Sequence, residues 1–393
     1  MRYILVLLIF FTIVPIYSQQ SKSMNKIQQL ISEVQKKYAP DKRTARFNIS
    51  YEALNQKKII LTGETNLLKA KISLLNELNK NGYNVQDKIS VLPDKNLGEN
   101  IFGVIKISVA TMRTKPKEAA ELTSQVLLGC SIKIFKKMKG WALIQTPDKY
   151  IAWMELSGYQ PMNKAQVDEW RSSKKIIITK EYGFVFSKPD INSNHVSDLV
   201  VGVILKKLSN EGEFVKVEFP DKRKGYVLNN ICENFKSWLK SRNPNEDNII
   251  KTAYRFMGIP YLWGGTSAKA MDCSGYTRTV FFLNGIYLPR DASQQVNIGI
   301  PIDTKNGFSN LKPGDLLFFG KKATAKTKEK ITHVGIYIGN DEFINEAGRV
   351  KIDSFNKNAK NFSRYRLNQF IRAKRILTSI GKNGVELLKN VQY

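Results

Sequence analysis

The sequence is short of the residues on which metal and redox chemistry depend, with three cysteines and two histidines among its 393 residues. None of them stands at the spacing of a metal-ligand cluster, and no glycine-rich phosphate-binding loop is present. We therefore expect no metal and no cofactor. Beyond the N-terminus the chain also lacks an apolar stretch long enough to cross a bilayer, so no stable membrane span is expected after processing.

The N-terminus has the pattern of a secretory signal peptide. Arg2 provides the positive start, Ile4–Ile13 is apolar apart from Thr12, and Ser18 is a suitable cleavage point. We predict a signal peptide over residues 1–18 and an exported protein, periplasmic or extracellular; an uncleaved anchor is the alternative. No cysteine lies near the cleavage point, which excludes a lipoprotein anchor.

Three cysteines do not make the disulfide framework of a small exported domain. Their odd number leaves at least one free thiol, and Cys273 is the natural candidate because it lies in a motif rather than a strand. Cys130 lies in a strand-like stretch and is expected to be a small buried residue. A bridge between Cys130 and Cys232 remains open.

The chain carries a formal net charge of +28, which raises the question of a polyanionic partner. Its lysines are spread along the whole length, and no nucleic-acid-binding motif accompanies them. We therefore expect a solvated basic surface and no nucleic acid partner.

Changes in hydrophobic pattern predict a multidomain α+β protein. Residues 19–99 combine helical and strand-like segments in a small α+β module. Residues 100–158 hold short strands broken by turns, which is typical of a small β-barrel, and residues 174–232 repeat the scheme more loosely. The last domain covers residues 245–378 and has helices followed by an antiparallel sheet.

The strongest chemical signal is Asp272–Gly275 (DCSG), which precedes an apolar run of helical length. Cys273 would lie in the first turn of that helix, where unpaired N–H groups and the helix dipole favour a thiolate and also bind an oxyanion. A thiol needs a base at neutral pH, and His333 opens the strand-like run His333–Ile338. A nucleophile on a helix that faces a base on a sheet edge is the arrangement of papain-type sites.

A third group is needed to hold the imidazole in one tautomer. Asn345 lies twelve residues after His333, on the next strand, and period-two counting makes it a cross-strand neighbour. Its side-chain oxygen would accept a hydrogen bond from one ring N–H and leave the other ring nitrogen for Cys273. The alternative is that Asn345 only closes a turn.

The C-terminal part of the sequence resembles the NlpC/p60 family of cysteine peptidases over about residues 248–377. The resemblance implies a papain-like catalytic domain in which Cys273 is the nucleophile, His333 the base and position 345 the polar orienter. Many members have histidine at that last position, so Asn345 is a departure that preserves orientation without adding charge. The motifs that carry it are YLWGG (261–265), DCSG (272–275), LPRDAS (288–293), LKPGDL (311–316) and HVGIYIG (333–339).

The two strand-rich regions look like bacterial SH3-type barrels, and the layout resembles γ-D-glutamyl-L-diamino acid endopeptidases. The resemblance implies that the first barrel limits the groove to peptides with a free N-terminal L-Ala, with Glu121 and Tyr150 near that amine and Asp291 opposite. It also implies that Tyr261 and Trp263 line the groove. The remaining contacts, to the peptide backbone, would come from Asp272 and Ser274.

These residues predict an exported monomeric cysteine peptidase that hydrolyses the γ-D-Glu–L-diamino acid bond of peptides derived from peptidoglycan. Three alternatives stay open: an endopeptidase of intact peptidoglycan, a non-catalytic wall-binding protein, and an acyl transferase on the same scaffold.

Overall fold

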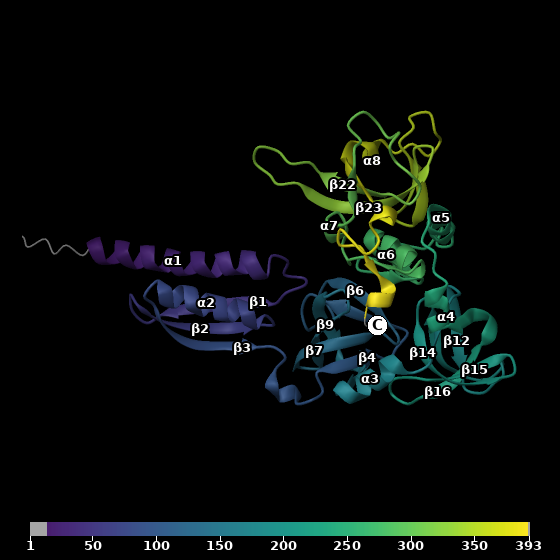
Figure 1. The fold of residues 1–393 in the computed structure, drawn as a ribbon, viewed down its shortest axis with the longest axis horizontal. Helices are drawn as coiled ribbons and strands as arrows, with labels where there is room; N and C mark the ends of the chain where they lie inside the picture. The colour runs from purple at the N-terminus through teal and green to yellow at the C-terminus, as the bar shows by residue number, and fades with distance from the viewer. Residues whose placement is uncertain (1–13, 392–393) are drawn as a thin grey trace, which may run out of the picture. The chain divides into compact units, whose positions relative to one another are not determined.

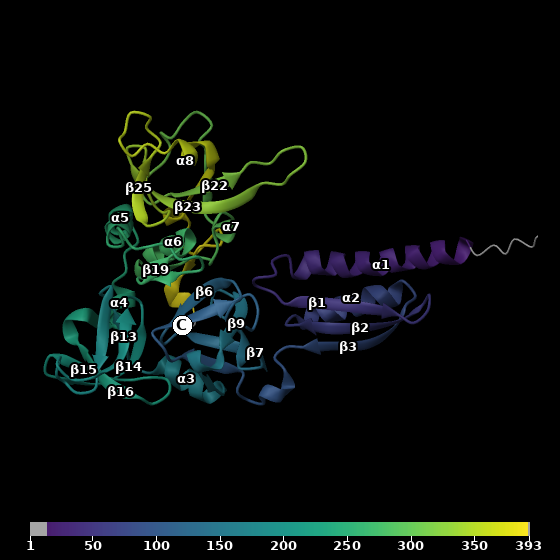
Figure 2. The same ribbon diagram turned by 180° about the vertical axis from the view of Figure 1, so that it is seen from behind.

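The computed structural model describes residues 14–391, and their side chains from residue 25. Most of the predicted signal peptide therefore lies outside the described residues. The chain divides into two compact units, one ending at Asn96 and the other beginning at Leu97. Figures 1 and 2 show the ribbon from opposite sides. Within residues 14–391, no helix has the length and apolar character that a membrane span requires.

The N-terminal unit has two helices and a three-stranded sheet in the order β1-β2-β3. β1 pairs with β2 in antiparallel fashion, whereas β3 runs parallel to β2 because α2 forms the crossover between them. The apolar stripe of α2 is buried at Ala70, Leu74 and Leu78 and forms part of the core of this unit. The elements are α1 (Val14–Tyr38), β1 (Phe47–Ala53), β2 (Lys58–Thr65), α2 (Leu68–Lys80) and β3 (Asn84–Val91).

The second unit begins with two strand-rich regions. In the first, seven strands form one sheet in the order β10-β4-β7-β8-β9-β5-β6. β10 and β6 end this order, so the hydrogen-bonded sheet is open between them. Its strands are β4 (Phe102–Ile105), β5 (Val109–Arg113), β6 (Leu122–Leu127), β7 (Ser131–Met138), β8 (Trp141–Gln145), β9 (Ile151–Glu155) and β10 (Tyr159–Met162).

The second region follows the helix α3 (Lys164–Ser172) and is again an open seven-stranded sheet, in the order β13-β12-β16-β15-β14-β11-β17. The helix α4 (Phe235–Lys240) then leads toward the C-terminal part. The strands are β11 (Lys175–Ile178), β12 (Tyr182–Phe186), β13 (His195–Val200), β14 (Ile204–Glu211), β15 (Phe214–Glu218), β16 (Lys224–Leu228) and β17 (Cys232–Asn234).

The two regions meet closely at Gly129. The backbone N–H of Ile204 donates to the carbonyl of Leu128, and a Cβ on Gly129 would lie 1.9 Å from the carbonyl oxygen of Ile204. Gly129 also has a φ of +90°, a backbone conformation that residues other than glycine rarely adopt. Glycine is therefore required at this junction for two independent reasons.

The C-terminal part has a six-stranded sheet in the order β21-β26-β22-β23-β24-β25, with helices on both sides. Figure 1 shows α6 and α8 on opposite sides of β22 and β23. The helices are α5 (Glu246–Tyr254), α6 (Cys273–Leu283), α7 (Ala292–Gln295) and α8 (Arg364–Gln369), and the sheet strands are β21 (Ile300–Ile302), β22 (Leu316–Lys321), β23 (Lys330–Gly339), β24 (Glu342–Glu346), β25 (Val350–Ser354) and β26 (Phe370–Arg375). Short strands β18 (Thr266–Ser267), β19 (Ala270–Met271), β20 (Ile286–Tyr287) and β27 (Glu386–Leu387) form two separate pairs.

Alternation along the strands separates two hydrophobic cores. Phe318, Val334 and Ile344 pack in the core that contains α6. Phe319 and Phe343 lie on the opposite face and pack in a second core, which α8 covers. The C-terminal sheet thus has a nucleophile-bearing helix on one face and a second helix above the histidine on the other.

Candidate active site

Cys273 occupies the first position of α6. Asp272 is the N-cap, and its carboxylate accepts a hydrogen bond of 2.7 Å from the backbone N–H of Gly275. The loop before the helix contacts the same carboxylate, since the N–H of Gly264 donates to its other oxygen at 3.0 Å. The YLWGG loop is therefore fastened to the residue that starts the helix.

Arg290 completes a buried network around this helix start. Its guanidinium forms an ion pair of 2.7 Å with Asp272 and donates to the Ser274 hydroxyl at 3.0 Å. It also donates to the Ser124 hydroxyl of β6 at 3.0 Å, which connects the site to the first strand-rich region. Asp272 and Ser274, which the resemblance assigns to substrate, are buried in this network, so their contact with substrate remains a prediction.

His333 lies on β23 and contacts Asn345 on β24. One ring nitrogen, Nε2, lies 2.8 Å from the Asn345 side-chain oxygen, so the predicted contact is present. In the sheet register Asn345 is opposite Gly335, which makes it the diagonal neighbour of His333. A Cβ on Gly335 would lie 3.1 Å from the Cβ of Asn345, so the glycine leaves the space through which the two polar groups meet.

Asp353 determines how the Asn345 amide is oriented. The Asn345 Nδ2 group donates to one Asp353 oxygen at 2.9 Å, while the Lys351 ammonium pairs with the other at 3.0 Å. Since the amide nitrogen must face the carboxylate, the amide oxygen faces the imidazole. Nε2 of His333 therefore carries the proton, and Nδ1 is left with a lone pair. No motif in the sequence pointed to Asp353.

Burial favours the neutral forms of both Cys273 and His333. Burial raises the pKa of the Cys273 thiol to about 12, and the Asp272 charge adds to the effect; the N–H groups of Val334 and Ser274 oppose it. Burial lowers the pKa of His333 to about 3, and the positive charge of Arg366 acts in the same direction. The helix-start contribution expected from the sequence is thus present, but desolvation outweighs it.

The first strand-rich region provides one wall beside the site. Trp263, which is 59% exposed, donates from its indole nitrogen to Glu121 at 2.9 Å. The hydroxyl of Tyr150 lies 3.4 Å from a carboxylate oxygen of Asp291. Four of the predicted substrate residues are therefore brought together in two pairs, each with one member from either side of the interface.

Tyr261 and Glu346 lie on the α6 side of the site. Tyr261 is 39% exposed, and burial, followed by the charges of Cys273, Asp272 and Glu346, raises the pKa of its hydroxyl. Glu346 is fully buried, and neither of its carboxylate oxygens has a hydrogen-bond partner among residues 14–391. Burial raises the pKa of Glu346 to about 8, so this carboxyl group is protonated at neutral pH. No motif in the sequence indicated its position.

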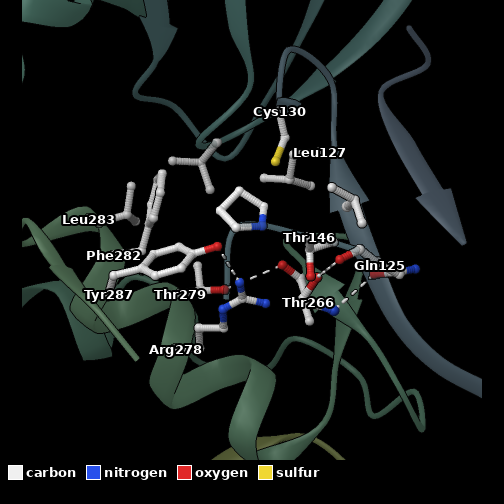
Figure 3. Close-up of a pocket in the computed structure, with 13 residues that line it drawn as sticks. Gln125, Leu127, Cys130, Thr146, Thr266, Arg278, Thr279, Phe282, Leu283 and Tyr287 are labelled. Atoms are coloured by element: carbon white, nitrogen blue, oxygen red, sulfur yellow. Dashed lines mark hydrogen bonds between the residues drawn. The ribbon is translucent and has the colours of Figure 1, made fainter. Parts of the chain in front are cut away.

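The other two cysteines take no part in this arrangement. None of Cys130, Cys232 and Cys273 forms a disulfide within the described residues, so the bridge between Cys130 and Cys232 is absent. Cys130 lines a cavity of about 50 Å³ between the two strand-rich regions and α6. Figure 3 shows Arg278 and Tyr287 pointing toward each other there, and they are joined by a hydrogen bond of 2.8 Å.

No group of three or more histidine, cysteine, aspartate or glutamate side chains in the described part of the chain has an arrangement that would hold a metal ion.

Comparison with known families identifies two domains. Residues 258–370 match the NlpC/P60 family, and residues 112–158 match the bacterial dipeptidyl-peptidase SH3 domain. These ranges contain the Cys273 and His333 side chains and the Glu121 and Tyr150 side chains, respectively.

Similar proteins include two named γ-D-glutamyl-L-lysine dipeptidyl-peptidase. The one from Bacillus cereus is 28% identical over 58% of this chain and 67% of its own length. The one from Bacillus subtilis is 26% identical over 57% of this chain and 71% of its own length. A crystal structure of an NlpC/P60 family protein from Bacillus cereus covers 70% of this chain and 99% of its own, at 24% identity and a TM-score of 0.60, and so shares the fold.

Proposed function

We propose that this chain, a cysteine-type peptidase with an NlpC/P60 domain and a bacterial SH3 domain, hydrolyses the γ-D-Glu–L-diamino acid bond of peptides derived from peptidoglycan. The names of its Bacillus relatives support this bond as the target. The predicted signal peptide supports action outside the cytoplasm. The observation that carries the proposal is the His333–Asn345 contact of 2.8 Å beside the cysteine at the start of α6.

The chemistry follows from the two neutral groups. Nδ1 of His333 takes the Cys273 proton as the sulfur attacks the γ-carbonyl of D-glutamate, so charge separation occurs only as the new bond forms. Backbone N–H groups in the first turn of α6 stabilise the oxyanion. The imidazolium then gives its proton to the departing diamino-acid nitrogen, and the C–N bond breaks.

Water completes the cycle. His333 takes a proton from the water molecule that attacks the thioester, and the dipeptide L-Ala–D-Glu leaves with a free γ-carboxylate. The cysteine sulfur recovers its proton from the imidazolium, which restores both neutral groups. Asn345, itself held by Asp353, keeps the ring in one orientation through both steps.

Selectivity for a free N-terminal amine would come from the wall of the first strand-rich region. Glu121 and Asp291 provide carboxylates, and Tyr150 provides a hydroxyl, at the two interface pairs. An ammonium group that loses its water needs such acceptors. An acylated N-terminus would offer no charge to them, so blocked peptides and intact wall would be poor substrates.

The test uses defined L-Ala-γ-D-Glu-diamino acid tripeptides, with free and acetylated N-termini, followed by mass spectrometry. We expect the wild-type protein to cleave the free tripeptide far faster than the acetylated one or intact sacculi, and Cys273→Ala to abolish cleavage. Cys232→Ala is the matched control, because this thiol lies on β17, outside the site. Cleavage that survives Cys273→Ala would refute the mechanism, and preferred cleavage of sacculi would favour an endopeptidase of intact wall.

A further inference from the structure

Arg366 lies on α8, above the sheet face that carries the histidine. α8 begins after Ser363, whose hydroxyl accepts a hydrogen bond of 3.3 Å from the Arg366 N–H. The Arg366 guanidinium lies 5.7 Å from the centre of the Phe319 ring and 5.3 Å from that of Tyr365. Two aromatic rings therefore fix the direction of this side chain. α8 is visible next to β22 and β23 in Figure 2.

Within the described residues, the Arg366 guanidinium forms neither a hydrogen bond nor an ion pair, although it is partly buried. Burial lowers the pKa of Arg366. In contrast, Arg375 pairs with Asp315 at 2.8 Å, and Arg290 is bonded on all sides. A half-buried arginine whose fork of N–H donors is unused is suited to a planar anion.

Its position is on the histidine side of the site. The Phe319 ring that lies under Arg366 is 5.6 Å from the His333 ring. After burial, the Arg366 charge is the largest cause of the lowered pKa of His333. Arg366 is therefore near the imidazole.

The reaction sets which part of the substrate this position faces. His333 must reach the departing nitrogen, so the released residue lies on the histidine side, whereas the free amine of the acyl part points toward Glu121 and Asp291 on the other side. The released diamino acid carries a carboxylate on the carbon next to that nitrogen.

We propose that Arg366 binds the carboxylate of the released diamino acid and makes the enzyme selective for peptides in which this carboxylate is free. The proposal rests on the proposed function and adds a recognition point for the C-terminal end of the tripeptide. The arginine would bind through paired N–H donors, a geometry that an amide in place of the carboxylate does not match.

The test compares two substrates, L-Ala-γ-D-Glu-L-Lys with a free C-terminal carboxylate and the same peptide as its C-terminal carboxamide. We expect the wild-type protein to prefer the acid by about ten-fold or more in kcat/KM, the range of a charge-assisted hydrogen bond. Arg366→Gln should remove the preference mainly by raising KM for the acid. Arg366→Lys, which keeps the charge and loses the fork, should retain part of it.

Arg364→Gln is the matched control, because Arg364 is an exposed arginine on the same helix, and it should keep the full preference. Equal cleavage of acid and amide by the wild-type protein would overturn the proposal. So would an equal loss on both substrates in Arg366→Gln, because this would show that the arginine supports His333 or the fold. Failure of the proposed function would look different: the wild-type protein would cleave neither peptide.

Discussion

The two strand-rich regions have the same number of strands in one open sheet, but they contact the catalytic domain in different ways. The first region reaches the catalytic loops with buried polar groups. Ser124 bonds to Arg290, and the side-chain oxygen of Gln125 accepts from the Thr266 N–H at 2.9 Å. It also forms the Glu121–Trp263 and Tyr150–Asp291 pairs.

The second region contacts the catalytic domain through ion pairs. Glu181 pairs with Arg255 of the segment that follows α5 at 2.7 Å, and Asp198 pairs with Lys269 at 2.6 Å. These ion pairs are each about one-third to one-half exposed. Two sheets with the same number of strands thus contact the catalytic domain in different ways, through buried polar groups in the first and partly exposed ion pairs in the second.

The largest expected effect tests the buried interface. Arg290→Gln should destabilise the second unit by about 3–5 kcal/mol, because Asp272 would remain buried without its cation. The control, Arg255→Gln at the second region, should cost about 1 kcal/mol or less, because that pair is partly exposed. Urea unfolding of both variants measures the difference. Equal losses would show that the two interfaces are energetically alike.

A smaller effect is expected at the junction between the two regions. Gly129→Ala meets the Ile204 carbonyl at 1.9 Å, whereas Gly140→Ala, with a similar φ of +83°, meets nothing within 4 Å. Both variants should lose about 1–2 kcal/mol from the left-handed backbone. Gly129→Ala should lose about 1–3 kcal/mol more from overpacking. Matching unfolding midpoints for the two variants would mean that the junction relaxes freely.

The smallest effect is expected on substrate binding. Glu121→Gln should raise KM for the free tripeptide by roughly ten-fold, because one acceptor for the N-terminal ammonium loses its charge. Glu181→Gln, which removes a carboxylate from the second region, should leave KM unchanged. Steady-state kinetics on the free and acetylated tripeptides separates the two. A comparable rise in KM for Glu181→Gln would give the second region a role in the groove.

Local patterns in the sequence predicted much of the C-terminal sheet and the contact between His333 and Asn345. Period-two alternation places side chains on a face, and the turn between the strands restricts their register, so this neighbourhood followed from spacing alone. The helix that begins near Cys273 was predictable for a similar reason, since a capping aspartate precedes an apolar run. The roles of these residues in catalysis remain predictions.

Long-range packing explains what the sequence did not reveal. Arg290 lies within a recognised motif, but only the fold brings it to Ser124, 166 residues away. Arg366 and Glu346 lie in no distinguishing local pattern. Neither side chain forms a hydrogen bond within the described residues, and a local sequence pattern does not reveal this. β3 has polar, largely exposed residues that resemble a loop in sequence. Strand periodicity likewise does not reveal which strands end a sheet.

The neutral state of Cys273 has a consequence for the lifetime of the enzyme. Peroxides oxidise the thiolate rather than the thiol, and a buried cysteine with a raised pKa offers them very little thiolate. In such an enzyme the sulfur stays reduced in the resting state, and the thiolate forms only as the sulfur attacks the substrate carbonyl. The same desolvation that makes the resting thiol unreactive therefore also slows its oxidation.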